Sequence, residues 1–429
     1  MSQALQPVRG THDLMAADYA RHEAVILAAQ RVAMLYGYAR IDTPMFEFSE
    51  VFHRAVGDSS DIVSKETYSF TDRGGESLTL RPEFTASVVR ALISNKLTQE
   101  LPFKCFYAGP AFRYERPQKG RQRQFHQVGA ELLGASEPTA DVEMIVLAAH
   151  TLRVLGLGDA VTLELNSLGD AESRAAYREA LVVYLTQHEA GLSDDSKIRL
   201  AKNPLRILDS KNEGDRAIIA GAPLLTDYFN DHSKQFFAAV RAGLANLGIV
   251  FTLNAKLVRG LDYYSHTVFE FTTSQLGAQG TVLAGGRYDG LVGLMGGPEI
   301  AGMGFAAGVE RLVGLREVLQ VAQAGTQTPR VHVVPMGDSA ENAAWELATQ
   351  LRAAGIATEI AYKGKAGKRL ERANKQGAEI ALMLGDDELA ANTVTLKHFK
   401  TGVQETIPRA ELINTLRHSN ESWNPSLQQ

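Results

Sequence analysis

The chain has 429 residues, of which 45% are hydrophobic and 22% are charged, and its formal net charge is −5 at pH 7. These values predict a folded chain of two to four domains, and they argue against a disordered protein or one coated in positive charge. The single cysteine, Cys105, excludes an internal disulfide and a cysteine-rich zinc site, and no apolar run suggests a signal region or a membrane span. A cytoplasmic protein is therefore expected.

The N-terminal part predicts a helix followed by a strand. Val25, Ala28 and Val32 recur at helical spacing within a segment from about 18 to 35, and Gly37 supplies a stop. An extended segment follows at 38–42. Because an amphipathic helix followed by a strand is a common pairing, this part of the sequence does not by itself indicate a function.

A hairpin and a second helix come next. Two short alternating segments around a Gly-Gly pair predict a β-hairpin at 68–80. The Arg-Pro-Glu sequence that ends at Glu83 is expected to open a helix to about Ile93, which places Glu83 and Thr85 in its first turn. An acid there has a purely structural explanation as well, because it stabilises the positive end of the helix dipole.

A short basic segment runs from Phe112 to Gln127. Pro117 and Gly120 interrupt it between two apolar stretches, which predicts a strand, a loop and a returning strand. Its basic residues are Arg113, Arg116, Lys119, Arg121 and Arg123. Because arginine binds phosphate bidentately, such a loop is suited to a triphosphate, although a charge run taken alone is more simply a solvated basic turn.

The middle of the chain changes character twice. A helix is expected at 141–155, and the residues from about 172 to 254 form polar helical segments with few strand signals, which predicts an inserted helical domain. Strands are expected at 161–165, 267–271 and 281–284. A glycine-rich turn then leads into a helix that carries Glu310 and Arg311. Alone, this turn is weak evidence of a site, because glycines also permit close packing.

The C-terminal part reads as a separate small domain. A linker of small and polar residues at 322–328 precedes an alternation of strands and helices, which predicts an α/β domain with a mainly parallel sheet. The strands are expected at 331–335, 357–361 and 380–384. A basic cluster comprises Lys363, Lys365, Lys368, Arg369, Arg372 and Lys375. It is either a solvated helix face or a contact to a phosphate backbone.

Several of these stretches carry a resemblance to a known family. The pattern F-R-x-E-R-P followed by G-R-x-R-Q-F-H-Q resembles motif 2 of the class II aminoacyl-tRNA synthetases, in the form found in the histidyl-tRNA synthetase family. Residues 257–264 (LVRGLDYY) and 284–289 (AGGRYD) resemble the two signatures peculiar to that family. The G-x-G-F-x-x-G-x-E-R stretch resembles motif 3, and the N-terminal helix, strand and proline resemble motif 1, which builds a dimer interface.

The resemblance implies a fold, an activity and partners. The fold would be an α+β catalytic domain with the antiparallel class II synthetase sheet, a helical insertion and a C-terminal α/β anticodon-binding domain. The implied parts are 1–170 and 255–322 for the catalytic domain, 171–254 for the insertion and 329–429 for the anticodon-binding domain. A homodimer would activate L-histidine with ATP and Mg²⁺ to histidyl-adenylate and pyrophosphate, and then transfer histidine to the 3′ end of tRNA(His).

The resemblance also implies residue roles. The catalytic arginines that approach the α-phosphate would be Arg259 and Arg113. Histidine would be bound by Glu83, Thr85, Gln127, Glu131, Tyr263, Tyr264 and Tyr288, with Glu131 and Tyr264 on the two ring nitrogens. ATP would be bound by Arg113, Glu115, Arg121, Phe125 and Arg311. These chemistries rest on positioning and charge stabilisation, so the sequence needs no nucleophilic side chain.

Three residues depart from the family pattern, and two other functions stay open. Phe84 stands where glycine is frequent, Tyr114 where histidine is common, and Gln122 where an aromatic residue is frequent. A catalytically inactive paralogue that regulates ATP phosphoribosyltransferase would lose the motif arginines and the C-terminal domain, and a sensor of uncharged tRNA would need no ATP site. The chain keeps the motif arginines Arg113, Arg259 and Arg311 and a full C-terminal domain, which argues against both functions. A class I synthetase is excluded because the HIGH and KMSKS signatures are absent.

Overall fold

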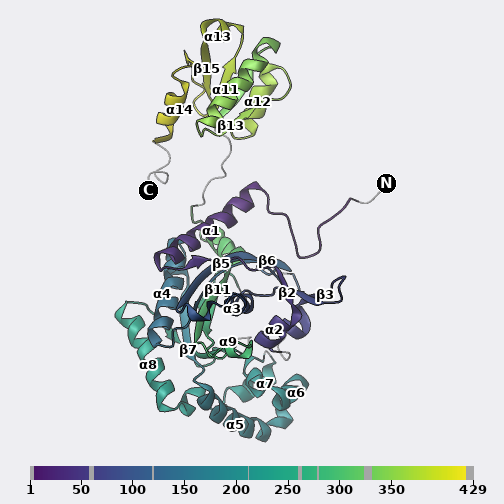
Figure 1. Cartoon of the computed structure of the whole chain (residues 1–429), viewed down its shortest axis with the longest axis vertical. Coiled ribbons are helices and arrows are strands. Elements are labelled where there is room, and N and C mark those ends of the chain that lie inside the picture. Colours follow the sequence, from purple (N-terminus) through teal and green to yellow (C-terminus); the bar gives the residue numbers. More distant parts are fainter. Residues whose placement is uncertain are drawn as a thin grey trace. The chain divides into compact units, whose positions relative to one another are not determined.

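The computed structural model describes residues 4–57, 62–117, 120–210, 212–258, 263–277, 280–322 and 331–421 (Figure 1). The chain divides into two compact units, Met1–Ala324 and Gly325–Gln429. None of the described helices is long and apolar enough to cross a membrane.

The first unit is built on an eight-stranded sheet with the order β1-β5-β6-β11-β10-β9-β7-β8. Its strands are β1 (Ala39–Arg40), β5 (Phe103–Phe112), β6 (Gln124–Leu133), β7 (Thr162–Ser167), β8 (Thr252–Leu253), β9 (Ser265–Thr272), β10 (Thr281–Arg287) and β11 (Gly302–Gly308). The six central strands are antiparallel, and only the short edge strands β1 and β8 pair in parallel with their neighbours. The expected antiparallel sheet is thus confirmed.

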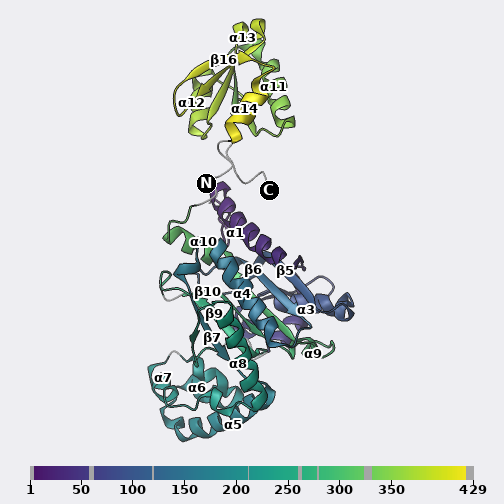
Figure 2. The ribbon, with the colours of Figure 1, turned by 90° about the vertical axis from the view of Figure 1, so that its left-hand side faces the viewer.

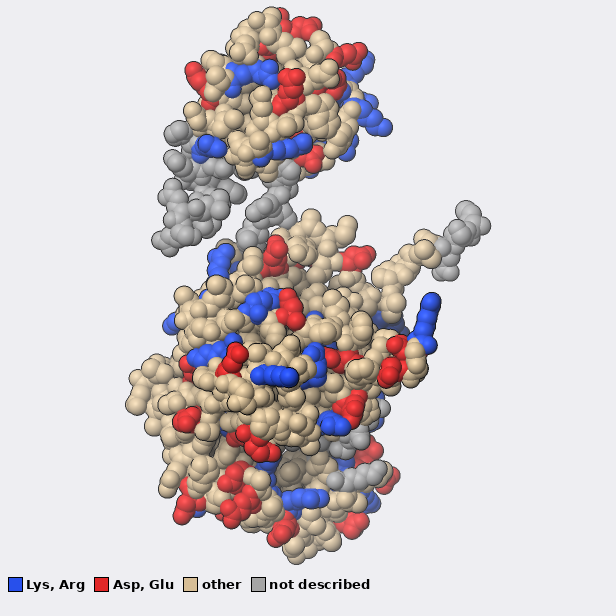
Figure 3. Space-filling model, in the orientation of Figure 1, with Lys and Arg blue, Asp and Glu red and all other residues tan. Residues whose placement is uncertain are grey.

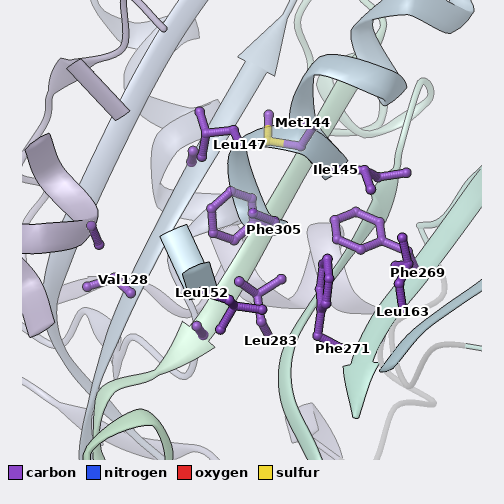
Figure 4. Packing of buried hydrophobic residues seen from close by; sticks show 14 of the residues in the cluster. Val128, Met144, Ile145, Leu147, Leu152, Leu163, Phe269, Phe271, Leu283 and Phe305 are labelled. Carbon is purple, nitrogen blue, oxygen red and sulfur yellow. The ribbon is translucent and has the colours of Figure 1, made fainter. Parts of the chain in front are cut away.

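Helices cover both faces of this sheet. One face packs against α1 (Ala16–Leu35), α4 (Pro138–Val154), α8 (Asp231–Asn246) and α10 (Val309–Val318), and the other against α2 (Ser49–Val56), α3 (Thr85–Ser94) and α9 (Leu291–Leu294). In Figure 4, Phe305, Phe269 and Phe271 from the sheet lie beneath Met144 and Ile145 of α4. Figure 2 shows α4 and α8 side by side over the sheet.

The strand period of two decides which side chains reach each face. On β6, Val128, Ala130 and Leu132 enter the core beneath α4, so Gln127 and Glu131 point to the side of α3. This alternation brings polar residues of β6 into one layer with α3, and that layer contains the candidate site.

A small three-stranded sheet, β2-β4-β3, lies beside α2, and Glu47 of β2 pairs with Arg90 of α3. Its strands are β2 (Phe46–Phe48), β3 (Tyr68–Thr71) and β4 (Ser77–Leu80). The predicted hairpin β3–β4 is confirmed, with Gly75 at φ +90° in its turn. The expected helix start was wrong: α3 begins at Thr85, so Glu83 precedes the helix and its carboxylate caps the N–H groups of Thr85 (2.6 Å) and Ala86 (2.9 Å).

Helical structure fills the chain between β7 and β8. Its helices are α5 (Ala171–Gln187), α6 (Asp194–Lys202), α7 (Glu213–Ile219) and α8. The first three enclose a small apolar cluster of their own around Tyr177, Leu181 and Leu185. At the starts of these helices, backbone N–H groups of the first turn donate to the capping side chains of Asp170, Ser193, Asn212 and Asn230.

The second unit has a five-stranded sheet with the order β13-β12-β14-β15-β16. Its elements are β12 (Val331–Pro335), α11 (Glu341–Ala353), β13 (Thr358–Ile360), α12 (Ala366–Lys375), β14 (Ile380–Leu384), α13 (Asp386–Ala391), β15 (Thr393–His398), β16 (Gln404–Pro408) and α14 (Leu412–Glu421). The three expected strands pair in parallel, as predicted. The antiparallel hairpin β15–β16 was not predicted from the sequence.

The basic cluster in and just before α12 is not uniform. Arg369 is buried, donates to the carbonyl oxygen of Pro335 (3.0 Å) and pairs with Glu341 (2.6 Å). The other basic residues of the cluster are exposed. On the face seen in Figure 3, acidic and basic side chains are interspersed over the first unit, in keeping with the modest net charge.

Candidate active site

One pocket in the first unit collects the candidate residues. Of the thirteen predicted from the sequence, Arg259 lies outside the described residues. The other twelve line this pocket, and they are Glu83, Thr85, Arg113, Glu115, Arg121, Phe125, Gln127, Glu131, Tyr263, Tyr264, Tyr288 and Arg311. They come from α3, the β5–β6 hairpin, β9, β10 and α10 or from the loops beside them, so segments far apart in sequence converge here.

Glu131 forms the buried end of the pocket. It is 1% exposed, and its carboxylate accepts hydrogen bonds from the hydroxyls of Thr85 (2.7 Å), Tyr107 (3.2 Å) and Tyr288 (2.5 Å). Burial raises the pKa of Glu131 to about 8, although the three hydroxyl donors oppose the rise. The site therefore holds an oriented carboxyl group whose ionised form is disfavoured by burial.

Glycines on neighbouring strands make room for this carboxylate. A Cβ on Gly304 of β11 would overlap the Oε2 atom of Glu131, and one on Gly129 would overlap the Tyr107 hydroxyl. The buried end of the pocket thus depends on the close approach of strands that only glycine permits.

Aromatic hydroxyls close the wall beside Glu131. The ring centroid of Tyr263 lies 4.7 Å from that of Tyr264 and 5.7 Å from that of Tyr288. Burial, followed by the charge of neighbouring acidic groups and tyrosines, holds the pKa values of Tyr263 and Tyr288 well above the usual range. Both phenols therefore keep their protons at neutral pH and can donate hydrogen bonds.

Glu83 and Gln127 lie between the two ends of the pocket. Burial raises the pKa of Glu83, while the N–H groups of Ala86 and Thr85 lower it. The Oε1 atom of Gln127 is buried and has no hydrogen-bond partner among the residues that the structure describes. An acceptor left open in a buried wall favours a ligand that brings a donor, such as an ammonium group.

Three arginines gather at the opposite end. Arg121 pairs with Glu115 at 3.0 Å, and Arg113 lies 4.0 Å from the same carboxylate. Arg311 donates to the carbonyl oxygens of Thr281 (2.6 Å) and Gly120 (3.3 Å).

Charged groups surround Arg311 at this end. Burial, and then the charge of Arg121, lower the pKa of Arg311, while Glu115 and Glu270 oppose this change. Glu310 accepts from the backbone N–H of His126 (2.8 Å) and contacts its Nδ1 (3.0 Å). Three convergent guanidinium groups are suited to a polyanion.

An aromatic ring lies beside the arginines. Phe125 lines the pocket, and the guanidinium carbon of Arg113 is 5.4 Å from its ring centroid. Arg113 is itself held by a hydrogen bond from Nε to the carbonyl oxygen of Pro82 (2.9 Å). A flat apolar surface next to guanidinium groups suits a purine attached to a phosphate chain.

The sequence analysis missed two residues of the site. Tyr107, which donates to Glu131, is fixed by the same alternation on β5 that buries Cys105 on the α3 face, so strand periodicity could have indicated it. Glu310 was noticed as part of a motif but given no role. Its contact with His126 crosses 184 residues, which no local pattern reveals.

The three departures from the family pattern occupy different environments. Phe84 is 1% exposed and stacks on Tyr107 with ring centroids 4.4 Å apart. Gln122 lines the pocket, and Tyr114 is 54% exposed. Phe84 therefore supports Tyr107 from behind as well as lining the pocket.

Comparison with known proteins agrees with this geometry. The family model described as histidyl-tRNA synthetase matches residues 10–312, and the anticodon binding domain model matches residues 330–419. The chain is 54% identical to a histidine–tRNA ligase of Gluconobacter oxydans (96% of this chain, 98% of the relative) and 55% identical to one of Rhodospirillum rubrum (95% and 98%). It resembles the crystal structure of apo S. aureus histidyl-tRNA synthetase with a TM-score of 0.82 and 34% identity over 96% of this chain and 99% of that one. On this evidence the chain belongs to the histidyl-tRNA synthetase family.

Proposed function

We propose that the chain is a histidine–tRNA ligase that forms histidyl-adenylate and pyrophosphate from L-histidine and ATP, and then esterifies the 3′ end of tRNA(His). One observation carries the proposal: a single pocket joins a buried, hydroxyl-oriented carboxylate at Glu131 to a cluster of three arginines. The first end suits an imidazole and the second a triphosphate, so the two substrates would meet between them.

At the histidine end, Glu131 would accept a hydrogen bond from one ring nitrogen, and Tyr264 would contact the other. Gln127 and Glu83 would receive the α-ammonium group, with Thr85 nearby, and Tyr263 and Tyr288 would enclose the ring. An apolar side chain of similar size would leave these buried polar groups unpaired, which gives strong discrimination without a separate editing domain.

At the nucleotide end, Arg113 would contact the α-phosphate, and Arg121 and Arg311 the outer phosphates or the adenine. Phe125 would stack on the adenine, and Glu115 would lie near its edge. By family resemblance, Arg259 would approach the α-phosphate from the histidine side. That assignment concerns a residue outside the described part of the chain.

Both steps are positioning reactions. The histidine carboxylate oxygen attacks the α-phosphorus and pyrophosphate leaves; the ribose hydroxyl of tRNA then attacks the activated carbonyl and AMP leaves. The arginines stabilise charge that develops on oxygen, which explains why the pocket needs no nucleophilic side chain. Mg²⁺ bound with the triphosphate would neutralise part of its charge, and Glu115 and Glu310 are the carboxylates with suitable oxygens at this end.

We further assign the chain's parts by function. Residues 1–170 and 255–322 would form the catalytic domain, residues 171–254 an insertion against the acceptor arm of tRNA, and residues 329–429 the anticodon-binding domain. The exposed lysines of α12 would contact tRNA phosphates. The protein would act in the cytoplasm.

A homodimer is supported by the small sheet β2-β4-β3. Cross-strand rows place Phe46, Phe48, Tyr68 and Phe70 with Leu78 and Leu80 on one face. Phe46, Phe48 and Phe70 are 54%, 56% and 46% exposed, whereas Glu47 and Thr79 on the other face are buried. Three exposed phenylalanines on one face of a small sheet favour coverage by a second copy, in the region that resembles motif 1.

The decisive test of the activity is ATP–pyrophosphate exchange with purified protein across the amino acids. Exchange with histidine alone is the expected result. Folded protein that binds histidine but catalyses no exchange would favour the regulatory paralogue, and binding to ATP phosphoribosyltransferase subunits would then be measured.

A further inference from the structure

The chain before α1 forms a tight turn at residues 8–11, called here the N-terminal turn. The backbone N–H and the side-chain hydroxyl of Thr11 both donate to the carbonyl oxygen of Val8, at 2.9 and 2.7 Å. Gly10 adopts φ +85° within it, a conformation that favours glycine.

This turn rests directly on the basic loop of the active site. The backbone N–H of Arg123 donates to the carbonyl oxygen of Gly10 at 2.7 Å. A Cβ on Gly10 would lie 2.8 Å from Cγ of Arg123 and 3.0 Å from Cγ of Pro117. Gly10 is therefore restricted twice, by its backbone conformation and by a contact with no space for a side chain.

Arg123 occupies the place where the β5–β6 hairpin passes into the loop. Its carbonyl oxygen accepts the N–H of Arg113 at 2.9 Å, just beyond the last paired residues of the two strands. Its guanidinium carbon lies 4.0 Å from the ring centroid of Tyr114, and its Nε donates to the carbonyl oxygen of Glu115 at 3.4 Å. The Arg123 side chain thus runs between Gly10 on one side and Tyr114 on the other.

Arg123 touches the backbone of two residues that line the pocket. Arg113 is one of the three convergent arginines, and Glu115 holds another, Arg121, at 3.0 Å. A displacement of Arg123 would therefore move Arg113 and Glu115, whereas Glu131 on β6 and its donors Thr85 and Tyr288, on α3 and after β10, would keep their places.

We propose that the N-terminal turn is a positioning element for the nucleotide end of the pocket, acting through Arg123. The inference rests on the proposed function, because it assumes that this end binds ATP. Residues 113–117 and 120–123, the described part of the loop beyond the paired strands, have little regular backbone structure, and the turn supplies an external hydrogen bond and a steric stop. Phosphate-binding groups must be held within fractions of an ångström. Loss of the support from the turn should therefore lower the affinity for ATP or the rate of adenylate formation.

The test compares alanine substitutions at two glycines with similar positive φ angles. Gly75 has φ +90° and no atom within 4 Å of the position its Cβ would take, whereas Gly10 has φ +85° and meets Arg123. In ATP–pyrophosphate exchange, Gly10→Ala is expected to raise the KM for ATP or lower kcat by about tenfold, with the KM for histidine within about twofold of wild type. Gly75→Ala is expected to change neither.

A further variant and a double mutant complete the test. Gly10→Asn tolerates a positive φ better than alanine but still places a Cβ against Arg123, so it should show the same ATP defect if Gly10→Ala folds poorly. In an Arg123→Ala background, Gly10→Ala should add little, because the side-chain atoms that its Cβ would meet are removed. Equal kinetics of Gly10→Ala and Gly75→Ala in an active protein would overturn the positioning role. Absence of histidine-dependent exchange in the wild type would instead overturn the proposed function.

Discussion

The phenolic hydroxyl of Tyr288 donates to the carboxylate of Glu131 at 2.5 Å, across 157 residues of sequence. The contact joins β6 to the loop after β10 and fixes the carboxylate before any ligand arrives. With Thr85 and Tyr107 also donating, one oxygen of Glu131 has two donors and the other has Tyr288. Even so, burial prevails and raises the pKa of Glu131 to about 8.

The raised pKa of Glu131 predicts a pH-dependent stability. Its folded value of about 8 exceeds the ordinary 4.5, so the folded protein holds a proton that the unfolded chain releases between these values. The stability from this group is complete below pH 4.5 and falls as pH rises through about 8, by at most about 1.4 kcal/mol per pH unit. Glu131→Gln removes this dependence. Its melting temperature relative to wild type should therefore rise by several degrees between about pH 5.5 and about pH 8.5.

The control for this prediction is Glu179→Gln, which changes an exposed glutamate on α5 in the same way. Its melting temperature should follow the wild type at both pH values in thermal unfolding followed by circular dichroism. A Glu131→Gln difference that stays constant with pH would show that Glu131 is ionised throughout the range.

Tyr288→Phe tests the hydroxyl itself. Removing it leaves one carboxylate oxygen of Glu131 without its donor and loosens the group proposed to read the imidazole. The KM for histidine in ATP–pyrophosphate exchange is expected to rise by about tenfold or more, with the KM for ATP nearly unchanged. Tyr184→Phe is the matched control, because its hydroxyl donates to the carbonyl oxygen of Ile218 (2.8 Å) outside the pocket. An equal rise in both KM values for Tyr288→Phe would argue for a general packing role.

Local patterns predicted the elements better than the contacts between them. The strand period on β6 follows from the sequence, and the structure accordingly places Gln127 and Glu131 on one face. The start of α3 was misjudged because Glu83 caps the helix from outside its first turn, where propensity alone extends the helix through it. The contact of Glu310 with His126 depends on the register of separate strands, which no single stretch of sequence encodes.

Burial of charge was the hardest feature to predict. Arg287 and Asp141 form an ion pair in which both side chains are fully buried, yet the sequence shows only a charged residue in each of two separated segments. Arg369 is likewise one of six basic residues between positions 363 and 375, and the sequence does not distinguish it from the exposed ones. Its burial follows from the helix face that α12 turns toward β12, which is settled by tertiary packing.

The exposed apolar face of the small sheet predicts the oligomeric state. Phe48 and Phe70 both pair across Leu78, so glutamate at these positions would place two charges in the centre of the proposed dimer interface. The variant Phe48→Glu/Phe70→Glu is expected to shift a dimer to a monomer in analytical ultracentrifugation, with exchange activity falling alongside. Val250→Glu, at a site 88% exposed and away from this sheet, is the control and should stay dimeric. If the Phe48→Glu/Phe70→Glu variant and the wild type have the same mass, the interface lies elsewhere.

Substitutions of basic residues in and just before α12 can test tRNA binding and folding separately. Lys365 and Lys368 are exposed, whereas Arg369 is buried against Pro335 and Glu341. Reversing both lysines to glutamate should raise the KM for tRNA in aminoacylation by about tenfold and reduce its salt dependence, while pyrophosphate exchange stays at the wild-type rate. Arg369→Glu should instead destabilise the second unit. It leaves the carbonyl oxygen of Pro335 without its donor and places a second negative charge beside Glu341. Thermal unfolding distinguishes the two variants. If the lysine variant charges tRNA normally, the phosphate contacts lie on another face of this unit.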